Sequence, residues 1–155
     1  MIRSRFHFSL LVSLFLFVFG ACQYEVPITS LPTGKIDSRL LGNWESSDGK
    51  EKMMVRRLDD VVYIVYYDGD LFRAYHSDVA GTPFVSVQDI NSTERKYAYV
   101  TWKLSTDGEH LQLGSVNTEV IPKETKDSLA IVELLKKNLQ NPRLFGEAIE
   151  FRKQK

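Results

Sequence analysis

The sequence predicts a mainly β protein, an antiparallel up-and-down barrel of eight strands with one α-helix before the last strand. Short β-branched and aromatic runs recur from residue 40 to the end of the chain. Turn pairs such as Asp-Gly separate these runs, which favours antiparallel pairing of neighbouring strands. An open meander of eight strands would leave two unpaired edges, and closure into a barrel removes both. The alternative is an open half-barrel whose concavity is filled by the helix.

The first four strands are recognised by their turns and their alternation. Gly42 and Trp44 open the first strand, and a Ser-Asp-Gly turn ends it. Met53 and Val55 alternate with charged neighbours in the second. The third is β-branched or aromatic throughout, and Asp68 with the glycine after it forms a hairpin turn to the fourth. These strands are expected over residues 41–46, 51–58, 61–67 and 71–79.

The later strands follow the same pattern, and a helix interrupts them. The sixth strand places Ala98 and Val100 on one face together with Trp102 and Leu104. A second Asp-Gly pair joins it to the seventh. Between the seventh and eighth strands, apolar residues recur at three- and four-residue spacing, which predicts a helix over 126–140 that caps one mouth or packs on the wall. The four strands are expected over residues 84–90, 96–104, 111–116 and 147–153.

The first 21 residues are typical of a secretory signal peptide. Arg3 and Arg5 precede an apolar run over residues 8–19, and small residues then lead to Cys22. The run is too short for a membrane-spanning helix, which needs about 20 apolar residues. Cys22 is the only cysteine of the chain, so an internal disulfide is excluded.

The residues around this cysteine resemble the lipobox of bacterial lipoproteins, although Phe19 stands where leucine is usual. The resemblance implies that Cys22 becomes the first mature residue and carries a diacylglycerol and a further acyl chain such as palmitate. Acyl chains of this number would anchor the protein stably to a membrane. Gln23 after the cysteine, in place of aspartate, favours the outer membrane, with the protein facing the periplasm. The alternative is a lone cysteine at the end of a signal anchor.

Three segments are therefore expected. Residues 1–21 form the signal peptide, residues 22–39 a lipidated cysteine and flexible tether, and residues 40–155 the barrel domain. From Cys22 onward the chain has 18 Lys and Arg against 20 Asp and Glu, a net charge of −2. This charge excludes a basic nucleic-acid-binding surface.

The start of the first strand carries a second resemblance. Gly42-x-Trp44 is similar to the G-x-W motif of lipocalins and other calycins. The resemblance implies that Trp44 closes one end of the barrel and packs beside an arginine near the last strand. Arg152 is the matching residue here. The chain as a whole also resembles small bacterial lipoproteins with a lipocalin-like body.

Two functions follow from a barrel of this size. An apolar lumen would bind a small ligand such as a lipid or fatty acid, through Tyr63, Val65, Phe72, Tyr99 or Trp102, depending on which face of each strand points inward. Alternatively, these side chains fill the core, and the protein is a structural or inhibitory partner in an envelope complex.

An enzyme is the least supported class. His76 and Asp78 share a strand face, but two ligands fall short of the three or four of a zinc site. The sequence favours a strand end with solvated polar groups. No catalytic residues, metal or cofactor are expected.

Overall fold

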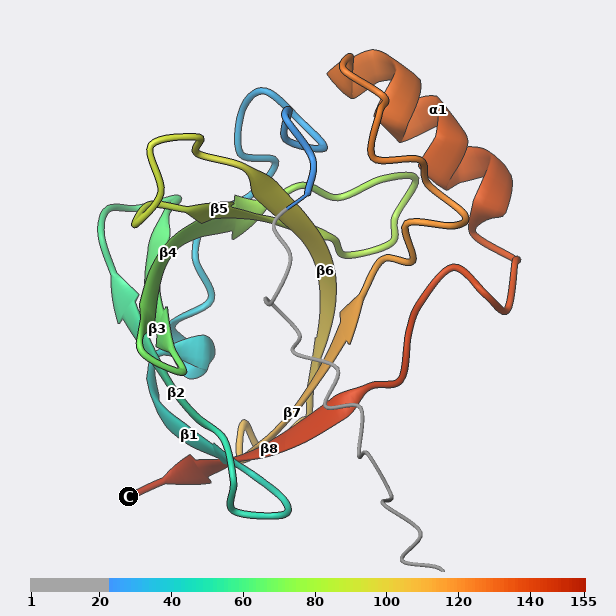
Figure 1. Ribbon diagram of the computed structural model, residues 1–155. Helices are drawn as coiled ribbons and strands as arrows, with labels where there is room; N and C mark the ends of the chain where they lie inside the picture. The colour runs from blue at the N-terminus through green and yellow to red at the C-terminus, as the bar shows by residue number, and fades with distance from the viewer. Residues whose placement is uncertain (1–22) are drawn as a thin grey trace, which may run out of the picture.

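The computed structural model describes residues 23–155, which form a closed barrel of eight antiparallel strands (Figure 1). Each strand pairs with its neighbour in sequence, and β1 (Gly42–Ser46) also pairs with β8 (Ile149–Gln154). The predicted fold class is thus confirmed, and the open half-barrel is excluded. The predicted signal peptide and Cys22 lie outside the described residues. The other strands are β2 (Lys52–Arg57), β3 (Tyr63–Tyr67), β4 (Asp70–His76), β5 (Val85–Asp89), β6 (Tyr97–Leu104) and β7 (His110–Ser115).

Strand alternation divides the apolar residues into two cores. In β3, Tyr63, Val65 and Tyr67 are buried inside the barrel, whereas Tyr66 is exposed on the outer wall. The inner core contains Leu40, Trp44, Met53, Val55, Tyr63, Val65, Tyr67, Phe72, Ala74, Val85, Val87, Ala98, Val100, Leu111, Leu113 and Phe151. The outer core contains Tyr24, Ile28, Val79, Phe84, Tyr99, Val116, Ile121, Ile131, Leu135 and Leu144.

Residues 23–40, which we call the strap, pack against the barrel. Tyr24 pairs with Tyr97 at the start of β6, and the Ile28 amide donates to the Ser86 hydroxyl at 3.0 Å. The strap then runs to the far end of β4, where the Thr33 amide donates to the His76 carbonyl at 2.9 Å. It ends in a short 3₁₀ helix, η1 (Ser38–Leu40), before β1.

The expectation of a flexible tether over residues 22–39 was therefore wrong for its described part. Its prolines and glycine signal the lack of a repeating backbone pattern, and they do not prevent packing. Tyr24 and Ile28 are 2% and 0% exposed, so the segment buries apolar side chains as a strand would. The predicted start of the domain at residue 40 leaves out this part of the outer core.

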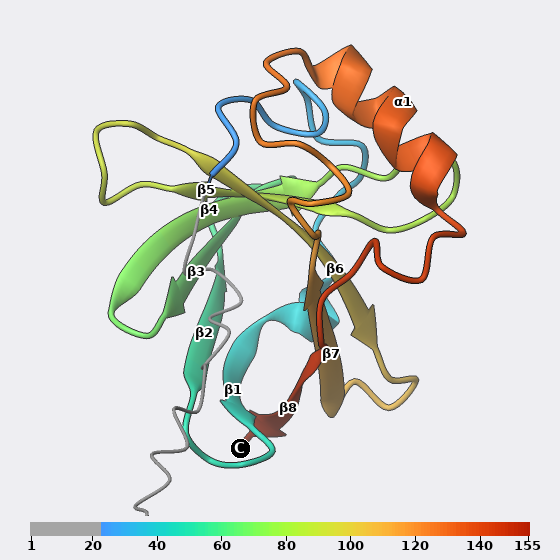
Figure 2. The same ribbon diagram turned by 45° about the vertical axis from the view of Figure 1, so that its right-hand side comes forward.

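The helix α1 (Ser128–Asn138) lies outside the barrel (Figure 2). The Asp127 side chain caps its start by accepting from the amides of Leu129 and Ala130. Ile131 and Leu135 are fully buried in the outer core, together with residues of the strap. The helix therefore packs on the wall, which was one of the two positions expected for it.

Trp44 is buried in the inner core, but its cationic neighbour is Lys153 and not Arg152. The Lys153 ammonium lies 5.3 Å from the centroid of the Trp44 ring and donates to the Arg39 carbonyl at 2.6 Å. Arg152 pairs with Glu45 across the strands and is exposed, because successive residues of β8 point to opposite faces. The predicted Trp44–Arg152 contact was wrong by one residue.

The backbone two residues before Trp44 requires glycine at position 42. Its φ is +143°, and a Cβ there would lie 2.9 Å from Cε of Lys153. The Gly-x-Trp pattern thus leaves space for the lysine that covers the indole.

Candidate functional site

The residues predicted to bind a ligand do not form a single set. Tyr63, Val65 and Phe72 line the lumen and are at most 4% exposed. Trp102 is partly buried and packs against the same core. Tyr99 belongs to the outer core, because Ala98 and Val100 on either side of it point inward. Its prediction as a lumen residue was wrong.

Tyr99 fastens the strap to the barrel wall. Its ring stacks on Tyr24 with centroids 3.8 Å apart, and its hydroxyl donates to the Val26 carbonyl at 2.7 Å. The Tyr24 hydroxyl in turn donates to the Ile121 carbonyl at 2.8 Å. Burial raises the pKa of both tyrosines, so both hydroxyls stay protonated as donors.

Much of the lumen is filled with buried side chains. A cavity of ligand size would expose the side chains that line it, even if it were closed to bulk solvent. The buried residues of the inner core are instead 0–6% exposed, including the aromatic rings of Trp44, Tyr63 and Phe72. An eight-stranded barrel is just wide enough for its own side chains to occupy the interior. Among the described residues, this buried part of the inner core therefore leaves little space for a ligand, whereas the side chains packed against it are partly exposed, namely Ile36, Leu41, Trp102, Leu104 and Ile149.

A polar cluster joins the strap to one mouth of the barrel. The Tyr63 hydroxyl lies 3.0 Å from Nε2 of His76 and accepts from the Asp37 amide at 2.5 Å. Trp102 meets both rings edge-on, at centroid distances of 5.2 and 5.3 Å. Sequence reasoning noticed His76 but paired it with Asp78, which is exposed. The sequence signal that could have identified this cluster is that His76 shares the inward face of β4 with Phe72.

The electrostatics of this mouth cluster favour neutral groups. Burial raises the pKa of Tyr63 to about 12. Burial also lowers the pKa of His76 below its usual 6.5, although Asp78 and Asp37 oppose that shift. The neutral Tyr63 phenol and the neutral His76 imidazole form a hydrogen bond between β3 and β4, and the Asp37 amide that donates to the same phenol ties the strap to this pair.

The outer wall of β2, β3 and β4 carries an exposed apolar row. Met54 pairs with Tyr66, and Tyr66 pairs with Leu71. These side chains are 36%, 42% and 40% exposed. A concavity of about 410 Å³ extends from Met54 and Tyr66 toward β1 and β8.

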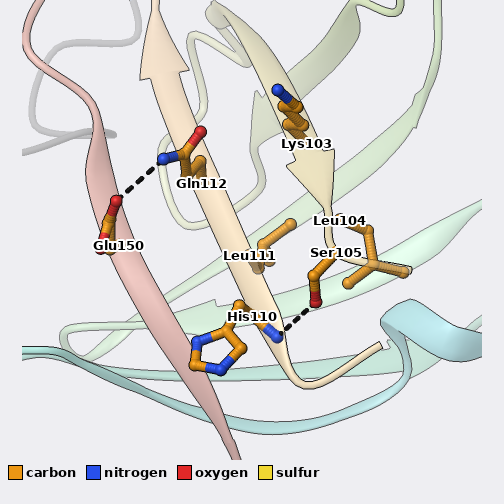
Figure 3. Close-up of a pocket in the computed structure, with 7 residues that line it drawn as sticks. All are labelled: Lys103, Leu104, Ser105, His110, Leu111, Gln112 and Glu150. Atoms are coloured by element: carbon orange, nitrogen blue, oxygen red, sulfur yellow. Dashed lines mark hydrogen bonds between the residues drawn. The ribbon is translucent and has the colours of Figure 1, made fainter. Parts of the chain in front are cut away.

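A second concavity, of about 360 Å³, lies over β6, β7 and the start of β8 (Figure 3). It is more polar. The Gln112 amide donates to a Glu150 carboxylate oxygen at 2.8 Å, and the His110 amide donates to the Ser105 hydroxyl at 2.9 Å. Lys103 lines the same hollow, so both signs of charge are present. This mixture fits a polar contact surface better than a site for an apolar ligand.

Within residues 23–155, no group of three or more His, Cys, Asp or Glu side chains is arranged to hold a metal ion. No helix in this part of the chain has the length and apolar character needed to cross a bilayer. Comparison with known proteins finds no match to a family model, a curated protein or a solved structure.

Proposed function

We propose that this protein is an envelope lipoprotein, anchored through Cys22, whose barrel is a filled scaffold that acts through its outer surface. In this proposal it has a structural or inhibitory role in an envelope complex and is not an enzyme. The observation that carries the proposal is the filled lumen, in which the aromatic side chains occupy the interior that a carrier would leave open. The anchor rests on the residue pattern around Cys22.

Carriage of a small apolar ligand such as a lipid or fatty acid is the second candidate. The lumen is apolar, and Trp102 and His76 are only partly buried at its mouth beneath the strap. Entry of a ligand would require the strap to leave this mouth and the inner side chains to move. The hydrogen bond from the Asp37 amide to the Tyr63 hydroxyl opposes that opening.

Native mass spectrometry separates the two candidates. The chain from residue 23, secreted without its anchor, retains Tyr24 and Ile28 and so keeps its outer core complete. We expect the mass of the polypeptide alone, both as purified and after incubation with an envelope lipid extract. A bound mass that leaves on denaturation would overturn the filled-scaffold proposal and identify the ligand class.

The anchor is tested separately on the full chain. The intact mass of protein extracted from membranes is expected to include a diacylglycerol and a third acyl chain on the chain beginning at Cys22. Cys22→Ala is the control and is expected to lose these additions. An unmodified Cys22 in the mature protein would overturn the anchoring part of the proposal and leave the filled lumen unaffected.

A further inference from the structure

The strap begins at a fixed point on the barrel. The amides of Gln23 and Tyr24 both donate to the Tyr97 carbonyl at 3.0 Å, and the Tyr97 amide donates back to the Tyr24 carbonyl at 2.8 Å. Gln23 is the residue that follows Cys22. One residue spans at most about 3.6 Å. If Cys22 is acylated, as proposed above, the start of β6 lies next to the lipid with no spacer between them.

One end of the exposed apolar row, at Leu71, contacts the loop that leads to this point, and the row continues from there across β3 to β2. The Leu71 carbonyl accepts from the Ile90 amide at 3.3 Å and from the Asn91 side chain at 3.0 Å. Leu71 is therefore held against the β5–β6 hairpin, the same hairpin that leads into Tyr97. Figure 2 shows the β3–β4 and β5–β6 hairpins projecting on the side of the molecule away from α1.

The chemistry of this wall suits the surface of a bilayer. Met54 and Leu71 are apolar, and Tyr66 between them has an apolar ring and a polar tip, which favours the interface between lipid and water. In the neighbouring row, Ile64 pairs with an exposed arginine on each side, Arg56 and Arg73. The Arg56 guanidinium donates to the Gly42 carbonyl and to Oδ1 of Asn43, which fixes it against β1. The Arg73 guanidinium, beside the apolar strip, can contact a lipid phosphate while the strip meets the acyl region.

We propose that the outer wall of β2–β4, with Met54, Tyr66 and Leu71 at its centre, rests on the membrane that holds the anchor. The inference depends on the proposed acylation of Cys22. It commits to a lipid surface because the start of the strap, at Tyr97, and the Leu71 end of the apolar row are both hydrogen-bonded to the β5–β6 hairpin. A protein partner would then bind another part of the outer surface, such as the polar concavity of Figure 3.

Fluorescence quenching tests the orientation. A small thiol-reactive fluorophore is attached to Leu71→Cys or Leu129→Cys in the acylated full-length protein, reconstituted in phosphatidylethanolamine and phosphatidylglycerol vesicles. Leu129 is the matched control, since it is also an exposed leucine, at 75%, but lies on α1. Lipids that carry a quencher near the headgroup are expected to reduce the emission at position 71 and to leave position 129 unchanged.

Two further readings separate the possible failures. Flotation with the vesicles and the intact mass report acylation, so loss of both would reject the anchor. Flotation with equal quenching at the two positions would reject the orientation alone. Equal quenching together with a photo-crosslink from Tyr66 to a protein in cells would assign the wall to a protein partner and overturn the proposal.

A spacer variant tests the role of the pinned strap. About eight Gly and Ser residues inserted between Cys22 and Gln23 would reach roughly 15 Å. The difference in quenching between positions 71 and 129 is then expected to shrink while flotation persists. An unchanged difference would show that the pinned start does not orient the barrel, and would overturn that step of the proposal.

Discussion

The indole of Trp44, near the start of β1, is held by contacts from two segments, the end of the strap and β8. Its Nε1 donates to the Leu40 carbonyl at 2.9 Å, the Lys153 ammonium covers its ring, and its side chain is 1% exposed. Position 44 could be selected from the sequence because it lies in a recognisable motif. The identity of the cation could not, since a shift of one residue along β8 exchanges the inner and outer faces.

Replacing Trp44 with alanine is expected to lower the free energy of unfolding by about 3–5 kcal/mol, because a large buried side chain leaves a cavity. Urea denaturation of the two proteins measures the change. Arg152→Ala removes an exposed side chain of the same strand and is expected to change stability by no more than about 0.5 kcal/mol. A comparable loss in both variants would contradict the placement of Trp44 in the core.

His76 gives stability a dependence on pH. Burial holds its pKa in the folded state below the usual 6.5, so the unfolded chain binds the proton more readily. The stabilising contribution of neutral His76 is fully present above about pH 6.5 and is lost as the pH falls through the lower pKa of the folded state. Thermal melts between about pH 7 and pH 5 are expected to show a smaller fall in Tm for His76→Gln than for the unmodified protein.

His110→Gln is the control for this measurement, since His110 is an exposed residue of the outer-wall concavity. It is expected to keep the slope of the unmodified protein. If the slope instead follows His110, burial of His76 does not cause the pH dependence.

At the scale of elements, periodicity separates what could be predicted from what could not. The strands and α1 repeat an apolar pattern every two or three to four residues, so local sequence reveals them. The strap repeats nothing, and the partners of Tyr24 are distant in sequence, at Tyr97, Tyr99 and Ile121. Proline-rich segments therefore need a count of their aromatic and β-branched residues before they are assigned as tethers.

Hydrogen exchange distinguishes a packed strap from a tether. The amides of Ile28, Thr33 and Ile36 donate to the barrel and are expected to exchange much more slowly than those of an unfolded peptide. Tyr24→Ala removes the stack on Tyr99 and is expected to speed exchange in the strap before it affects the inner strands. Unprotected amides throughout the strap of the unmodified protein would contradict its packing.

At the scale of the whole molecule, the sequence predicted a closed barrel but left open whether its interior was empty. Eight strands fix the width of the barrel, and only the summed volume and placement of the inward side chains determine what space remains. The summed volume depends on which face of each of the eight strands points inward. Tyr99 was expected to line the lumen, but it lies in the outer core, and Ala98 and Val100 point inward instead. Assigning one strand to the wrong face therefore changes the expected lining.

A substitution to a larger side chain tests whether the lumen is filled. Ala74 is 0% exposed on the inner face of β4, and Ala74→Leu is expected to cost about 1–3 kcal/mol through overpacking. Ala148→Leu enlarges an exposed alanine just before β8 and should be nearly neutral. Unfolding free energies from denaturant melts give both values. A neutral or stabilising Ala74→Leu would indicate spare volume in the interior.

The pairing of β1 with β8 also fixes when the molecule can be completed. Asn43 and Gln154 are cross-strand partners, although they stand near the two ends of the described chain. Every other strand can find its neighbour locally as the polypeptide emerges, but this seam requires the final strand. Until Ile149–Gln154 is available, both terminal edges of the meander remain unpaired and open to other strands. During synthesis the chain is therefore open to aggregation at these two edges until Ile149–Gln154 has been made.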